Sequence, residues 1–153
     1  MRTFVFRKNL TISGNYAIIE ARKEKKEKMN RKDLLIILQN QTSIIWDNLC
    51  ELYPALTSFN PPIIELNGRF YKTAGRCHQE DNVIQLGTKF FEYSIEYRDI
   101  MTEIILPHEI IHQVDYNLNG DSEAKCGHGK KWSEIMINYG LEANPFHKME
   151  ITR

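Results

Sequence analysis

Two histidines and a glutamate at helical spacing, inside a strongly apolar stretch, constrain the fold of this chain more than any other feature. Residues 108–112 read His-Glu-Ile-Ile-His, an H-E-x-x-H motif. On a helix, positions i and i+4 lie one above the other, so His108 and His112 face the same side. The apolar residues around them, from Ile104 to Val114, indicate that this helix is buried. Unpaired polar groups in a core are costly, and a metal ion would satisfy all three side chains together.

The same spacing is used by zinc hydrolases. His108 and His112 would supply neutral nitrogen ligands to one Zn2+ ion, and Glu109 would lie near a water molecule in an open coordination position. The sequence therefore predicts Zn2+ as the cofactor. It also predicts Glu109 as the general base that takes a proton from a zinc-activated water.

A third ligand is expected from a second helix. Apolar residues follow an i, i+3, i+4, i+7 pattern, which predicts an amphipathic helix that ends near Gly140: Trp132, Ile135, Met136 and Tyr139. Extending this face back by one turn from Trp132 reaches His128, which would then point inward. The segment between His112 and His128 is polar and turn-forming, so the second helix can fold back across the first.

Other residues remain alternatives for this position. In other H-E-x-x-H enzymes a glutamate from a later helix completes the site, and Glu123 and Glu134 lie at usable distances along the chain. Glu134 is two residues from Trp132, so on the expected helix it points away from the inward face. Two further alternatives stay open: His128 caps the helix or is simply exposed, and Cys126 binds the metal in the position left for water.

The chain resembles the SprT-like zinc metalloprotease family. The resemblance rests on Leu106-Pro107 with the H-E-x-x-H motif, and on Gly127-His128-Gly129 followed by Trp132 and Met136. Weaker similarity is found in residues 75–86 and in the tail of residues 144–151, so that the whole resemblance covers residues 60–151.

This resemblance implies zinc ligands at His108, His112 and His128 and a catalytic carboxylate at Glu109. It implies an α+β, zincin-like metalloprotease domain that cleaves a protein or peptide substrate. Many relatives also carry a cysteine-rich zinc ribbon or DNA-binding regions. This chain has no C-x-x-C pair, so it resembles a bare catalytic domain, and action on DNA-associated proteins is only one option.

Composition narrows the class of protein further. A length of 153 residues predicts one domain, and twenty acidic residues balance twenty basic ones. The zero net charge argues against strong general attraction to nucleic acid. The sequence shows no membrane-spanning apolar run and no signal peptide. The three cysteines do not form a disulfide framework, so a cytoplasmic location is expected.

The chain is expected to divide at a helix start near Asn30 and Asp33. Residues 1–29 would form an N-terminal arm or hairpin with a charged segment, and residues 30–153 the metalloprotease domain. The charged run over residues 21–32 is either a solvated face or a basic handle for DNA or an acidic partner. After Asn30 the following residues trace one face of a core-packing helix: Leu34, Leu35, Leu38, Ile45, Trp46, Leu49, Leu52 and Tyr53.

The middle of the chain is expected to form a small antiparallel sheet packed on helices. Residues 63–66 and 69–74 would pair as a hairpin through Asn67-Gly68, a strong two-residue turn signal. Residues 83–86 would add a third strand, and residues 90–93 a short helix. Pro107 requires either a bend in the metal-binding helix or a new helix that starts just before His108.

The predicted function is therefore a zinc-dependent metallopeptidase whose substrate lies along the exposed edge of the sheet. An additional donor to the oxyanion is expected from His147, Tyr116 or Tyr139, among which the sequence does not choose. The alternative is a non-enzymatic, zinc-stabilised module that binds DNA or protein. Glu109 argues against that alternative, because a structural zinc site needs no carboxylate there. A metal-dependent nuclease is disfavoured, because such sites usually hold more carboxylates.

Overall fold

The computed structural model describes residues 29–120, 128–145, 147, 149 and 151. Most of the predicted N-terminal arm lies outside these residues, and so do Glu123 and Cys126. The helices are α3 (Arg31–Leu52), η1 (Pro54–Ser58), α4 (Thr88–Tyr93), α5 (Ile95–Ile100), η2 (Met101–Ile105), α6 (Leu106–Asn119) and α7 (Lys130–Tyr139). The strands are β1 (Ile63–Asn67), β2 (Gly75–His78) and β3 (Val83–Gly87). No helix in the described ranges is both long and apolar enough to cross a membrane.

Helix α3 begins where the sequence predicts. The Asn30 side chain accepts a hydrogen bond from the Lys32 backbone N–H at 2.9 Å, which satisfies one of the free donors at the helix start. Most of the predicted apolar face is buried: Leu34, Leu38, Ile45, Trp46 and Leu49. Leu52, at the last position of the helix, is 48% exposed, so the prediction was wrong for that residue.

The sheet is mixed, and the prediction of an antiparallel sheet with a hairpin at Asn67-Gly68 was wrong. The strand order is β1-β3-β2. Strand β1 pairs with β3 in parallel, and β2 pairs with β3 antiparallel. The Asn67 side chain accepts from the Arg69 backbone N–H, which turns the chain away from a return strand. The physical reason for the order is hydrophobic, because Ile84 and Leu86 of β3 are fully buried and take the centre of the sheet.

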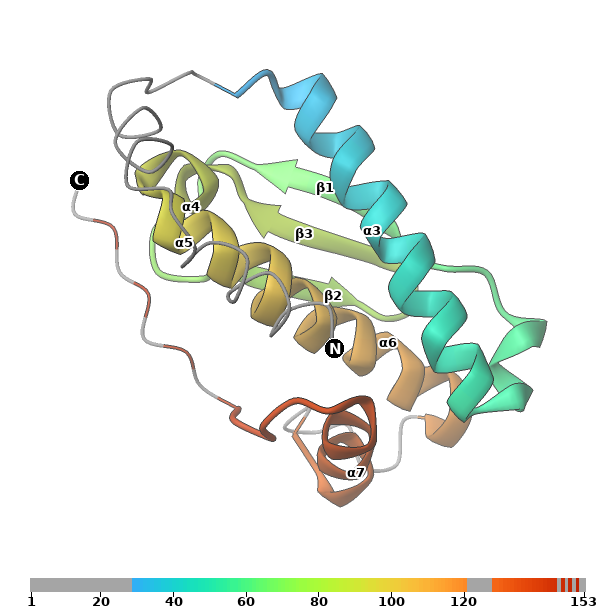
Figure 1. The fold of residues 1–153 in the computed structure, drawn as a ribbon. Helices are drawn as coiled ribbons and strands as arrows, with labels where there is room; N and C mark the ends of the chain where they lie inside the picture. Colours follow the sequence, from blue (N-terminus) through green and yellow to red (C-terminus); the bar gives the residue numbers. More distant parts are fainter. Residues whose placement is uncertain (1–28, 121–127, 146, 148, 150, 152–153) are drawn as a thin grey trace, which may run out of the picture.

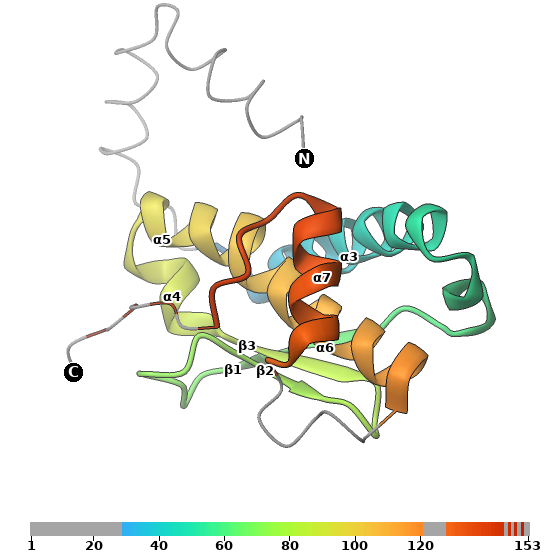
Figure 2. The ribbon, with the colours of Figure 1, turned by 90° about the horizontal axis from the view of Figure 1, so that it is seen from below.

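Two long helices pack on one face of this sheet. Helix α3 contacts β1, and α6 contacts β2 and β3. Figure 1 shows α3 and α6 crossing in front of the strands, and Figure 2 shows the strands below both helices, with α7 packed against α6. The core between the two layers combines Ile64, Ile84 and Leu86 of the sheet with Leu38 and Leu49 of α3 and Ile110 and Val114 of α6.

A wide helical turn leads into α6 and accommodates Pro107. Residues Met101–Ile105 form a π-helical segment, and α6 then begins at Leu106 with Pro107 in its first turn. Proline is tolerated there, because the π-helical segment changes the hydrogen-bond pattern of the preceding turn: the Leu106 backbone N–H donates to the Met101 carbonyl, five residues back. The backbone at Ile105 and Leu106 is right-handed helical, so the helix continues into α6, and the predicted new helix start just before His108 is not seen.

Candidate metal centre

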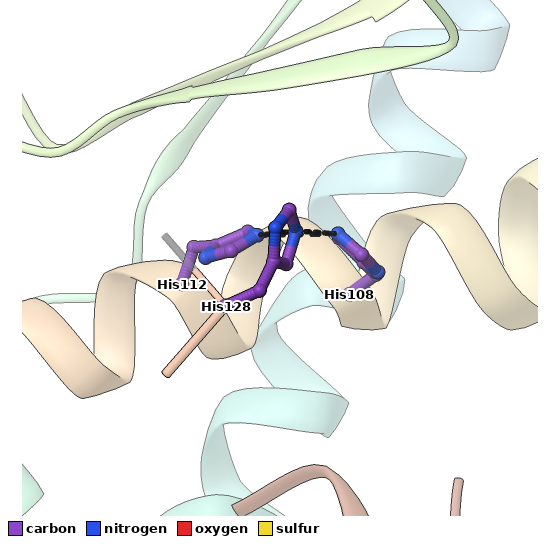
Figure 3. A group of neighbouring side chains, drawn as sticks. All are labelled: His108, His112 and His128. Carbon is purple, nitrogen blue, oxygen red and sulfur yellow. Dashed lines mark hydrogen bonds between the residues drawn. The ribbon is translucent and has the colours of Figure 1, made fainter. Parts of the chain in front are cut away.

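Three histidines from two parts of the chain meet at one point. His108 and His112 lie one turn apart on α6, and His128 precedes the first turn of α7 (Figure 3). The Nε2 atom of His112 lies 3.1 Å from Nε2 of His108 and 3.1 Å from Nε2 of His128. The third distance, between Nε2 of His128 and Nε2 of His108, is 3.3 Å, so the three atoms form a nearly equilateral triangle. The structure thus brings together the three residues that the sequence suggested as ligands.

The geometry of this triangle fits a metal ion. A tetrahedral zinc ion with Zn–N bonds of about 2.0–2.1 Å places its nitrogen ligands about 3.3 Å apart. Each neutral imidazole has one N–H, so three converging Nε2 atoms cannot all be satisfied by hydrogen bonds among themselves. A cation at the centre of the triangle satisfies three lone pairs at once, and these residues can therefore hold a metal ion.

The surroundings keep the histidines neutral and able to bind a metal. Burial, with smaller contributions from the neighbouring His147 and His128, lowers the pKa of His108 to about 3. Burial also lowers the pKa of His112 to about 3, with contributions from His108 and His128. Near neutral pH the lone pairs of both rings are therefore free to bind a cation, because neither ring carries a second proton.

Trp132 forms a platform behind the three imidazoles. It is fully buried, and its ring centroid lies 4.9 Å from that of His108, 5.2 Å from that of His112 and 4.7 Å from that of His128. The amphipathic pattern of α7 turns Trp132 toward α6, and Gly140 ends the helix in the left-handed conformation with φ of 101°. One side chain on α7 thus supports ligands from both segments.

Removing this platform is expected to destabilise both the core and the metal centre. Trp132→Ala should lower the free energy of unfolding of the metal-free protein by about 3–5 kcal/mol, because it leaves a large cavity. Trp132→Phe should cost much less, because it keeps a ring and removes a buried indole N–H that has no partner among the described residues. Urea unfolding of both variants measures this difference. An equal loss of unfolding free energy in the two variants would show that an aromatic ring at this position does not stabilise the fold.

Glu109 lies between the metal centre and the sheet. It is 8% exposed, and burial raises the pKa of its carboxyl group to about 8. The backbone N–H of Cys77 in β2 donates a hydrogen bond to this carboxylate, and the nearby charge of Arg76 partly offsets the effect of burial. A cation bound at the three histidines would favour the carboxylate further. Glu109 is therefore a buried carboxyl group, next in the chain to His108, that contacts the edge strand of the sheet.

Backbone groups in and beside β2 bond to two different neighbours, β3 on one side and α6 on the other. The Ala74 carbonyl accepts from the Gly87 backbone N–H at 2.8 Å, on the β3 side, whereas the Cys77 N–H faces Glu109. The Gln79 carbonyl accepts from Nε2 of Gln113, a buried residue of α6, at 3.1 Å. These bonds fix the edge of the sheet to the turn of α6 that carries His112. Sequence reasoning missed this connection, because it joins residues far apart in the chain.

Gly75 allows β2 to approach the carboxylate. A Cβ atom at this position would lie 3.0 Å from Cγ of Glu109 and 3.1 Å from side-chain atoms of Ile105 and Leu86. Contacts this short require the neighbours to move, and both apolar neighbours are buried in the core. Glu109 is therefore the group that we expect to be displaced.

Gly75→Ala is expected to reduce any activity that depends on Glu109 by roughly ten-fold, because a misplacement of 1 Å costs about 100-fold and the shift here is smaller. Metal content should stay at the wild-type level, since the three histidines lie on other elements. Gly68→Ala is the matched control, because its Cβ would meet only the Arg31 guanidinium at 3.4 Å. Equal activity of the two variants would show that the close approach of β2 is unimportant.

The other residues that the sequence suggested lie elsewhere. Glu134 is exposed on α7 and does not belong to the histidine cluster. Tyr116 lines a shallow cavity with His78, Gln79, Glu80 and Asp81 at the turn after β2. Tyr139 is buried on α7. Nε2 of His147 lies 3.4 Å from Nδ1 of His108, on the side of that ring away from the other two imidazoles.

A sequence model of the SprT-like family matches residues 55–152, more than half of the chain. Protein SprT of Vibrio parahaemolyticus is 33% identical over 96 residues, which are 62% of this chain and 54% of that protein. The chain thus spans about half the length of this curated relative. No solved structure matches the chain significantly.

Proposed function

The chain belongs to the SprT-like family, and on this basis we propose that it is a zinc-dependent metallopeptidase with a zincin-like fold. The observation that carries the proposal is the triangle of Nε2 atoms of His108, His112 and His128, with sides of 3.1–3.3 Å. Three imidazoles without a fourth protein ligand are typical of catalytic zinc sites, which keep one position open. Glu109, next to one ligand in the chain, supplies the carboxylate that such a site needs.

Bound at this site, zinc would act as a Lewis acid toward the scissile carbonyl and lower the pKa of a coordinated water toward about 7. Glu109 then accepts a proton from the attacking water at its carboxylate and passes it to the leaving amine. The Cys77 backbone N–H holds the carboxylate in place between β2 and α6. Burial raises the pKa of Glu109, which strengthens it as the acceptor in the first of these two transfers.

The substrate is proposed to be an extended segment of a protein that lies beside β2. Strand β2 is at the edge of the sheet, and it passes directly over Glu109. Main-chain groups at a sheet edge bind extended peptides of many sequences by adding a strand. Proteins associated with DNA are one class of such substrates. A non-enzymatic module that binds DNA or protein remains the alternative, and the buried carboxylate of Glu109 argues against it.

Two measurements on the wild-type chain test this proposal together. Elemental analysis should find one zinc per chain, and cleavage of casein or histones should stop when the zinc is removed by a chelator and return when zinc is added. The assay is run with and without single-stranded DNA, and stimulation by DNA would favour DNA-associated substrates. Zinc without cleavage in either condition would favour the binding module. Absence of bound metal would refute the proposed site.

A further inference from the structure

His147 contacts the metal centre from behind. Its Nε2 atom lies 3.4 Å from Nδ1 of His108, and the two ring centroids are 5.2 Å apart at an angle of 76°. The other nitrogen of His108, Nε2, faces His112 and His128. The two nitrogens of one imidazole point in different directions. A group bonded to Nδ1 therefore cannot also reach an ion held at Nε2, so His147 is not a fourth ligand in this arrangement.

The core holds His147 in this position. Met149, two residues further on, is 3% exposed and packs in the hydrophobic core, and Ile151 packs against the same core. The Met149 backbone N–H donates to the His147 carbonyl at 3.0 Å, which ties the two residues together. His147 itself is half-buried. The contact with His108 is thus fixed by burial of the neighbouring residue and is not a chance encounter of a surface side chain.

A histidine that binds a metal through Nε2 carries its proton on Nδ1, and that proton needs an acceptor. Carboxylates and backbone carbonyls usually accept this proton. Among the described residues, the hydrogen-bond partner of Nδ1 of His108 is instead the His147 ring. A neutral His147 with its proton on Nδ1 presents the lone pair of Nε2 to the N–H of His108. The pair then forms one N–H···N bond, in which each ring has a defined tautomer.

We propose that His147 is a positioning residue, which accepts a hydrogen bond from Nδ1–H of His108 and so sets the tautomer and orientation of that ligand. The inference rests on the proposed metal site but not on peptide cleavage. Outer partners of metal-binding histidines typically contribute 10- to 100-fold to metal affinity. His147 would thereby link the tail after α7 to the affinity of a site built on α6.

The test is a zinc titration of the metal-free, full-length chain against a chromophoric chelator. His147→Leu removes the acceptor, and we expect its dissociation constant for zinc to rise by about 10- to 100-fold. His147→Gln keeps an acceptor oxygen, and it should bind zinc within a few-fold of wild type. Glu134→Gln, on the exposed face of α7, is the control that should not change affinity. Wild-type affinity in the leucine variant, or equal weakening in the leucine and glutamine variants, would overturn the proposal.

A second measurement needs no substitution and so does not depend on how the variants fold. In the zinc-loaded wild type, nitrogen NMR of the imidazoles should show His108 with its proton on Nδ1 and His147 with Nε2 unprotonated. A proton on Nε2 of His147 would contradict the assigned acceptor role. If the wild type binds no zinc in the titration, the proposed metal site itself fails. If it binds zinc and the leucine variant binds it equally well, only the role of His147 fails.

Discussion

Glu109→Gln is expected to keep the full metal content of the wild type and to reduce peptide cleavage by about 10²- to 10⁴-fold, the usual contribution of a general base. Glutamine has nearly the same size and can still contact the Cys77 backbone, so the packing between β2 and α6 should survive. It cannot accept a proton from water, which removes both proton transfers proposed for Glu109. Elemental analysis and initial rates on one preparation of each protein measure the two effects separately.

Two further variants make this result specific. Glu109→Asp keeps a carboxylate but withdraws it by one methylene, so we expect a rate between those of the wild type and the glutamine variant. Glu134→Gln removes an exposed carboxylate of α7 and should leave the rate unchanged. Cleavage by Glu109→Gln at the wild-type rate would exclude Glu109 as the base. A loss of zinc in that variant would instead assign the residue a role in holding the metal.

The resemblance to the SprT-like family is confirmed by the match over residues 55–152. The features that the sequence predicted best depend on helical periodicity. One helical turn separates His108 from His112, so a local rule was sufficient to place these two side chains together. His128 joins them from just before α7, where Gly129 is extended, so the packing of α7 on α6 also contributes. The start of α3 was also predictable from local sequence, because the cap at Asn30 involves only residues close in the chain.

The features that the sequence did not predict depend on contacts between distant residues. The parallel pairing of β1 with β3 places Ile84 and Leu86 in the core, and this outweighed the turn signal at Asn67-Gly68. In the structure Gly68 does not adopt a positive φ, so the turn that the signal favours is not formed. The approach of Gly75 to Glu109 follows from that strand order, and no local pattern around Gly75 indicates it.

His128→Ala is expected to remove most of the zinc affinity of the chain. His128→Ala removes one corner of the triangle and leaves two ligands on α6, so its zinc affinity should fall by more than the roughly 100-fold that loss of an outer partner costs. After dialysis the variant should retain little zinc. Glu134→Ala, on the helix that follows His128, is the matched control, and it should bind zinc as the wild type does, because this side chain is exposed and outside the cluster.

Thermal unfolding distinguishes loss of a metal ligand from a general loss of fold stability. A metal ion that binds only the folded chain stabilises it by about 2.7 kcal/mol when its free concentration is 100 times the dissociation constant. Added zinc should therefore raise the melting temperature of the wild type and of Glu134→Ala, and leave that of His128→Ala nearly unchanged. The metal-free forms of all three should melt close together, because His128 lies at the partly exposed start of α7. Full zinc occupancy in His128→Ala would show that another residue supplies the third ligand. The triangle of imidazoles would then not be the metal site.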